Sequence, residues 1–120
     1  MSRALYLSPM VPSFDLDASS RFFQDVLGFA ERYSSPVYRI CEKDNLTVHF
    51  LPAGEGVGQM EFYLEVDDVD RLWAEIKDKL TGLKVREPFD QEYAMREAHI
   101  EVPATNALLF IGQSIPRSAG

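Results

Sequence analysis

Two stretches decide the fold: DLDASSRFFQDVL (15–27) and DVDRLWAEIKDKL (68–80), which repeat one pattern at an offset of 53 residues. Each opens with an Asp suited to an N-cap, because its carboxylate can accept a hydrogen bond from a first-turn N–H. A second Asp follows where the helix dipole favours negative charge. Gly28 and Gly82 stand where a helix end tolerates left-handed backbone. The two stretches therefore predict two helices, one in each half of the chain.

Both predicted helices carry one apolar stripe at the helical period, which indicates a face that packs against a sheet. In the second helix the stripe comprises Val69, Leu72, Trp73, Ile76 and Leu80. In the first it comprises Leu16, Ser19, Phe22, Phe23, Val26 and Leu27. We expect Trp73 in the core because it lies on this stripe.

Alternating segments around the helices predict strands with one apolar and one polar face. The segments 46–51, 61–66 and 97–102 alternate clearly, and 36–42 and 84–89 are further strands. The order is β-α-β-β-β twice, in one α+β domain spanning 1–120. Its two pseudo-repeats are about 1–53 and 59–113, joined by the glycine-rich AGEGVG (53–58), and residues 114–120 are expected to form a flexible tail.

Four segments stand in an order that resembles the glyoxalase, bleomycin-resistance and extradiol-dioxygenase superfamily. They are DLDASSRFFQDVLGF, LTVHF, LEVDDVDRLWAEI and MREAHIEVPATNALLF, and the resemblance covers roughly residues 5–112. It is closest to the bleomycin-resistance type, although VPATN replaces the usual DPDGN turn. The resemblance implies tandem βαβββ modules whose sheets curl around a cleft, with helices outside. It also implies a homodimer whose ligand cavities are lined by both subunits.

Metal-dependent members of the superfamily place one ligand on each of the first, fourth, fifth and eighth strands. Alignment on the capping aspartates puts these positions near Ser8, His49, Glu61 and Leu109. A leucine is no ligand and a serine is a poor one, so two of the four positions lack a metal-binding group. We therefore expect no cofactor. The alternative is a divalent metal held by His49, Glu61 and His99.

The polar faces of the strands supply candidate ligand contacts. His49 and Glu61 could form a hydrogen-bonded pair that moves a proton or holds a cation, or one that merely braces two strands. Aromatic residues and Met suit an adaptable pocket. The predicted ligand-binding residues are His49, Glu61, Tyr63, Phe89, Tyr93, Met95, His99 and Leu109.

Composition narrows the range of partners. The 120-residue chain has 19 acidic and 12 basic residues, a net charge of −7 that disfavours nucleic acid and anionic membranes. Its single cysteine, Cys41, fits a reducing compartment. The first residues match neither a signal peptide nor a membrane span, because Pro9 and Pro12 interrupt a short apolar patch. We therefore expect a cytoplasmic protein.

These observations favour a metal-free, dimeric protein that sequesters an aromatic or cationic small molecule, as in antibiotic resistance. Glu61, Glu65 and Glu101 would make its cleft acidic. The alternative is a metal-dependent lyase, isomerase or dioxygenase of the same superfamily, with His49 as base and Glu61 as its partner. A third possibility is a fold kept as an interaction module, with an occluded cavity.

Overall fold

The computed structural model describes residues 2–115, which form two modules with the same order of elements. The first contains β1 (Met10–Ser13), α1 (Leu16–Asp25), β2 (Ala30–Ser35), β3 (Tyr38–Lys43) and β4 (Leu46–Pro52). The second contains β5 (Met60–Glu65), α2 (Val69–Ile76), the 3-10 helix η1 (Lys77–Lys79), β6 (Val85–Asp90), β7 (Met95–Glu101) and β8 (Ala107–Ser114). Residues 116–120 of the predicted tail lie outside the described part, whereas Ser114 ends β8.

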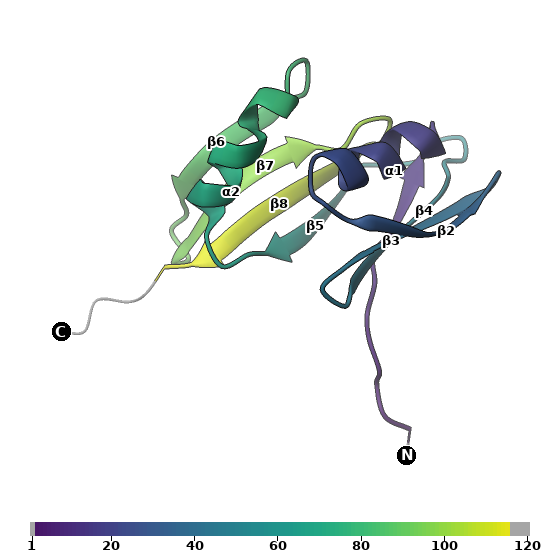
Figure 1. The fold of residues 1–120 in the computed structure, drawn as a ribbon, viewed down its shortest axis with the longest axis horizontal. Coiled ribbons are helices and arrows are strands. Elements are labelled where there is room, and N and C mark those ends of the chain that lie inside the picture. The colour runs from purple at the N-terminus through teal and green to yellow at the C-terminus, as the bar shows by residue number, and fades with distance from the viewer. Residues whose placement is uncertain (1, 116–120) are drawn as a thin grey trace.

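Each module builds one four-stranded mixed sheet, in the orders β1-β4-β3-β2 and β5-β8-β7-β6. The first strand of each module pairs in parallel with the last, and the other pairings are antiparallel. The two sheets lie beside each other, and residues 2–7 run away from them as an extended N-terminal arm (Figure 1). The prediction of an α+β fold with tandem βαβββ modules is confirmed.

The two helices begin where the capping aspartates predict. The Asp15 carboxylate accepts a hydrogen bond from the Ala18 N–H at 3.2 Å, and Asp68 accepts one from Arg71 at 3.0 Å. Gly28 and Gly82 have φ of 77° and 85°, in the left-handed region that favours glycine after a helix. Local sequence therefore fixes the start of each helix, and the two glycines mark the turns that follow α1 and η1.

Replacing either cap should weaken its helix by a similar amount. Asp15→Ala and Asp68→Ala should each lower the free energy of unfolding by about 1 kcal/mol, because one first-turn N–H loses its acceptor. Urea unfolding followed by circular dichroism measures the change, with Glu55→Ala in the exposed inter-module loop as control. Unchanged stability in both cap variants would contradict the assigned caps.

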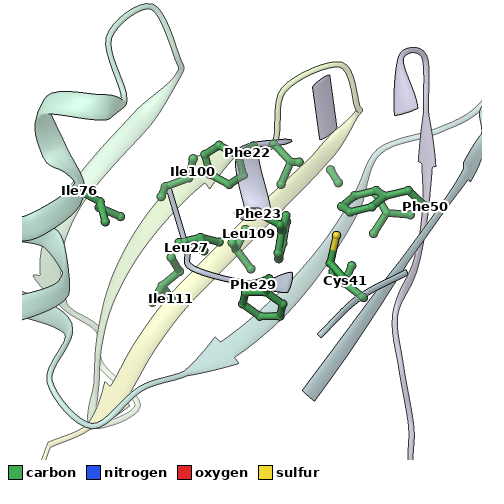
Figure 2. Packing of buried hydrophobic residues seen from close by; sticks show 14 of the residues in the cluster. Phe22, Phe23, Leu27, Phe29, Cys41, Phe50, Ile76, Ile100, Leu109 and Ile111 are labelled. Atoms are coloured by element: carbon green, nitrogen blue, oxygen red, sulfur yellow. The ribbon is translucent and has the colours of Figure 1, made fainter. Parts of the chain in front are cut away.

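One hydrophobic core connects the two modules. Helix α1 packs on the first sheet and α2 on the second. The Phe23 ring of α1 stacks on Phe62 of β5, with centroids 6.3 Å apart, so the first helix also contacts the second module. Figure 2 shows Phe23 between Phe50 of β4 and Leu109 of β8. The helix-covered faces of both sheets are thereby buried together.

Buried hydroxyl groups also join the modules. The hydroxyl groups of Ser13 and Ser19 lie 2.8 Å apart, and the Ser19 hydroxyl donates to the carbonyl of Pro103 at 2.8 Å. Both serines are almost fully buried, at 3% and 0% exposure. The carbonyl of Ala104 accepts the Phe14 N–H at 2.7 Å nearby. The turn predicted at VPATN thus fastens the second module to α1.

The predicted strand boundaries differ from the observed ones by one or two residues, and one of these differences has a local cause. The strand predicted over 36–42 begins two residues later, at Tyr38, because Pro36 and Val37 form the turn between β2 and β3. The Val37 N–H donates to the Ser35 hydroxyl at 3.2 Å, a local bond that competes with strand pairing. Among residues 2–115, no helix is long and apolar enough to span a bilayer.

Candidate ligand-binding face

Among residues 2–115, the helix that packs on the second sheet is α2, and we call the opposite face of this sheet the second open face. Strand alternation puts Glu61, Tyr63 and Glu65 of β5 on it, opposite Phe62 and Leu64, which pack against the core. The register adds side chains from the other three strands. They are Leu108 and Phe110 of β8, Glu97, His99 and Glu101 of β7, and Arg86 and Phe89 of β6.

Aromatic rings form the centre of the second open face. Register places Tyr63, Phe110 and His99 side by side across β5, β8 and β7. The His99 ring stacks on Phe110 with centroids 4.0 Å apart and planes at 14°. The ring of Phe89 meets His99 edge-on at 5.1 Å, and the guanidinium of Arg86 lies 3.4 Å from the Phe89 centroid. A π-rich floor of this kind suits contact with an aromatic or cationic molecule.

A buried carboxylate, that of Glu97, lies beneath this floor at 2% exposure. Its Oε1 accepts from His99 Nε2 at 3.1 Å and from Gln91 Nε2 at 3.2 Å, and its Oε2 accepts from the Tyr93 hydroxyl at 2.8 Å. Burial disfavours the charged form, but the hydrogen bonds from Tyr93, His99 and Gln91 outweigh it and hold the pKa of Glu97 below its usual range. Glu97 is therefore an ionised group with a satisfied set of donors.

A glycine makes room for this arrangement. Gly112 of β8 pairs with Glu97 on one side and Glu65 on the other. A Cβ atom there would lie 3.0 Å from both the Arg96 carbonyl oxygen and Glu97 Cγ, and 3.1 Å from Tyr63 Cε2. Glu97 and Tyr63 can thus approach each other across β8. Burial and the hydrogen bond that the Tyr63 hydroxyl donates to Glu65 at 3.1 Å raise the pKa of Tyr63.

The first sheet also has an uncovered face, the first open face, which carries His49. His49 Nδ1 lies 2.8 Å from the Tyr38 hydroxyl, and the two rings meet edge-on at 5.6 Å. A shallow pocket of about 390 Å³ borders His49. It is lined by Tyr6, Arg32, Tyr33, Ile40, Glu42, Asn45, Thr47 and His49, all from the first module.

The structure does not bring His49 and Glu61 together. His49 lies on the first sheet, where it bonds to Tyr38, and Glu61 is exposed on the second. The carboxylate that pairs with a histidine is Glu97, and its partner is His99. The hydrogen bonds and ring contacts of each histidine stay within its own module.

The pairing of β1 with β4 and of β5 with β8 shows which side chains lie next to the predicted metal-ligand positions. Beside β1, the Thr47 hydroxyl donates to the Ser8 hydroxyl at 2.8 Å, so Thr47 and not His49 lies next to Ser8. In the second module Glu61 pairs with Leu108. Of these four side chains only Glu61 is a good metal ligand. No group of three or more His, Cys, Asp or Glu side chains within residues 2–115 could hold a metal.

One further predicted contact, Leu109, takes a different position, whereas Met95 shares the face of Glu97 and His99 by register. Leu109 is 0% exposed and packs in the core, so the prediction that it faces the ligand side is corrected: Phe110 does. Strand alternation could have shown this, since Ala107 and Ile111 are core residues. Met95 is half-buried at the start of β7, where its sulfur lies 3.7 Å from the Ser114 hydroxyl.

The predicted ligand contacts omitted several residues of the second open face, among them Arg86, Phe110 and the buried Glu97. The burial of Glu97 depends on Gly112 and on the loop that carries Gln91 and Tyr93. Strand alternation places Glu97 on the polar face, but it does not predict that the Glu97 side chain is buried.

Another hollow, of about 580 Å³, lies between the modules, and Glu65 of the second open face is among its lining residues. It is open to solvent and runs between Leu27, Phe29 and Leu46 of the first module and the start of α2. Asp68, on its wall, already caps α2. We assign this hollow no chemistry.

Tandem βαβββ modules, each with one helix-covered face and one uncovered face, define a class of paired-module proteins. The family described as the Glyoxalase/Bleomycin resistance protein/Dioxygenase superfamily matches residues 7–108. The chain therefore belongs to this superfamily. A search of curated protein sequences finds no match.

Solved structures agree on the fold. The bleomycin-binding protein from bleomycin-producing Streptomyces verticillus, complexed with copper(II)-bleomycin, has a TM-score of 0.78 at 17% identity, covering 98% of this chain and 100% of that one. The bleomycin resistance determinant of transposon Tn5 has a TM-score of 0.76 at 21% identity, covering 92% and 98%. Lactoylglutathione lyase from Agrobacterium tumefaciens has a TM-score of 0.75 at 18% identity, covering 93% and 95%. Identities this low show the fold alone.

Proposed function

We propose that the protein is a metal-free, dimeric small-molecule-binding protein of the bleomycin-resistance type, which sequesters an aromatic or cationic compound. The observation that carries the proposal is the aromatic floor formed by Tyr63, Phe110, His99 and Phe89 on the second open face. Sequestration needs contact area and charge complementarity but no nucleophile, and this face supplies both. The solved structures that contain or are named for bleomycin agree with this ligand class.

Charge on the same face supports a cationic ligand. Glu61 and Glu65 are exposed on β5, and Glu101 is half-buried on β7. They flank the aromatic floor, and the chain as a whole carries a net charge of −7. An acidic rim of this kind raises the local concentration of cations and speeds their association.

Exposed apolar residues support a dimer. Leu5, Tyr6 and Leu7 of the N-terminal arm are 86%, 74% and 98% exposed. Met10 and Tyr33, on the first open face, are about half exposed. A second copy could cover these residues and bring the first open face of one subunit against the second open face of the other. His49 would then line the opposite wall of the ligand cavity. Buried, free Cys41 fits a cytoplasmic location, which we include in the proposal.

Calorimetric titration with metal-free bleomycin tests the ligand class. We expect saturable heat, and Tyr63→Ala should raise Kd about 10-fold because a stacking ring is lost. Tyr63 is 44% exposed, so its loss should leave the fold intact. Thr81→Ala, in the exposed loop after η1, is the control. No heat at high micromolar drug would rule this ligand out.

Two further measurements test the other parts of the proposal. Sedimentation should give twice the chain mass of 13.6 kDa if the protein is a dimer. Elemental analysis of protein purified without chelator should find no stoichiometric metal. Stoichiometric iron, nickel, zinc or manganese that disappears in His49→Ala would favour the metal-dependent enzyme instead.

A further inference from the structure

Glu97 and His99 form a hydrogen-bonded pair on β7. Glu97 is ionised at 2% exposure, and its carboxylate accepts hydrogen bonds from Gln91, Tyr93 and His99. Burying a carboxylate costs free energy even when it is hydrogen-bonded. An apolar residue on β7 would fill this position without that cost.

The imidazole of His99 is held in one orientation. Stacking on Phe110 and the edge contact with Phe89 fix its plane, and Glu97 engages its Nε2. Because an ionised carboxylate can only accept, the proton of the neutral ring lies on Nε2 and the lone pair lies on Nδ1.

The other ring nitrogen remains available for chemistry. His99 Nδ1 has no hydrogen-bond partner among residues 2–115. No buried side-chain nitrogen or oxygen in this part of the chain lacks a partner, so Nδ1 is in contact with solvent. The His99 side chain as a whole is 15% exposed. A basic lone pair is therefore presented beside aromatic rings on the second open face.

We propose that Glu97 and His99 form a general-base pair, in which His99 Nδ1 removes a proton from a planar carbon acid bound on the second open face. A suitable substrate is a conjugated carbonyl or heteroaromatic compound whose C–H bond is acidified by the adjacent group. The proton moves to Nδ1, and the C–H electron pair delocalises into the substrate. Return of the proton to another atom of the same molecule completes an isomerisation, so atoms and electrons balance without a co-reactant.

Glu97 acts in this step as a positioning residue. It fixes the tautomer that leaves Nδ1 free, and it stabilises the imidazolium that forms when the proton is taken up. His49 lacks this arrangement, because its Nδ1 lies against the Tyr38 hydroxyl. The inference rests on the proposed binding face but not on the identity of the sequestered compound.

A nitrobenzisoxazole is a suitable probe, because it is planar and its deprotonation is visible. Removal of its ring C–H proton forms a C≡N bond and breaks the N–O bond, which releases a coloured phenolate. We expect saturable turnover. His99→Ala should lower kcat/KM by on the order of 100-fold or more, the usual contribution of a positioned base. Equal rates in the wild type and His99→Ala would overturn the proposal.

Glu97→Gln tests the positioning role. It should lower kcat by at least about 10-fold, as the loss of a partner that orients an imidazole does elsewhere. Glu87→Gln, an exposed carboxylate on β6, is the matched control and should keep its activity. If Glu97→Gln does not fold, Glu97→Asp should fold and retain part of the rate. A rate unchanged in either Glu97 variant would overturn the positioning role.

Nitrogen-15 NMR of the imidazoles gives a second readout that needs no ligand. The chain has two histidines, so the spectrum of His49→Gln assigns the signals of His99. We expect the Nε2–H tautomer in the wild type and a mixture in Glu97→Gln. An Nδ1–H tautomer in the wild type would overturn the proposal. If the protein does not bind bleomycin, the expected probe turnover and His99 tautomer are unchanged. If it binds bleomycin but does not turn over the probe, the general-base pair is overturned and the proposed binding function is not.

Discussion

Phe23→Ala should lower the free energy of unfolding by about 3–5 kcal/mol, the cost of removing a fully packed aromatic ring and leaving a cavity. Phe23 is 2% exposed. Its ring lies edge-on to Phe22, Phe29 and Phe50 at centroid distances of 5.7, 5.1 and 5.4 Å, and it stacks on Phe62. These partners come from both modules, so neighbouring side chains cannot close the cavity without moving one module against the other.

Urea unfolding followed by circular dichroism measures this loss, at one protein concentration because assembly would shift apparent stability. Phe14→Ala is the matched control, since Phe14 is 60% exposed immediately before α1 and its loss should change stability by less than about 0.5 kcal/mol. A loss below about 1.5 kcal/mol in Phe23→Ala would show that the modules do not share this core. The result bears on function, because the core holds both open faces in place.

The helices and the faces of the strands were predictable because their signals are local. Capping aspartates, apolar stripes and the glycines after the helices depend on residues close in sequence, and the structure confirms both caps and both left-handed glycines. Strand alternation likewise assigned Tyr63 and His99 to the polar face, where the structure places them. Local chemistry was sufficient at these positions.

Register was not predictable to the residue, and this explains one misplaced position. Strand side chains alternate with a period of two, so an error of one residue moves a side chain to the opposite face. Leu109 was placed on the ligand side by such an error, and Phe110 occupies that side.

The pairing of Glu97 with His99 was also beyond reach from sequence. Both residues belong to the polar face of β7, but their contact requires that Glu97 bend under the imidazole instead of extending into solvent. The donors that hold it come from the loop before β7, and Gly112 on the neighbouring strand leaves the space. These are tertiary effects, which only the assembled sheet determines.

Gly112→Ala should lower the free energy of unfolding by about 1–3 kcal/mol, because the new methyl group overpacks the site. The added Cβ would meet the Arg96 carbonyl oxygen at 3.0 Å, and a backbone atom within a paired strand cannot yield as a flexible side chain can. It would also displace Glu97 and Tyr63, so the Nε2–H tautomer of His99 should be lost along with stability. Gly112→Val should lower the stability further and should also abolish the Nε2–H tautomer of His99.

The control for Gly112 is a glycine with open space around it. Gly54, in the inter-module loop, has no atom within 4 Å of the place where an added methyl group would lie, and its φ lies outside the left-handed region. Gly54→Ala should leave stability unchanged or raise it by up to about 1 kcal/mol, because alanine restricts the unfolded chain. If Gly112→Ala behaved like Gly54→Ala, the second sheet would have room to relax. In that event Glu97 would not be held against His99 by close packing, and its hydrogen bonds alone would have to position the pair.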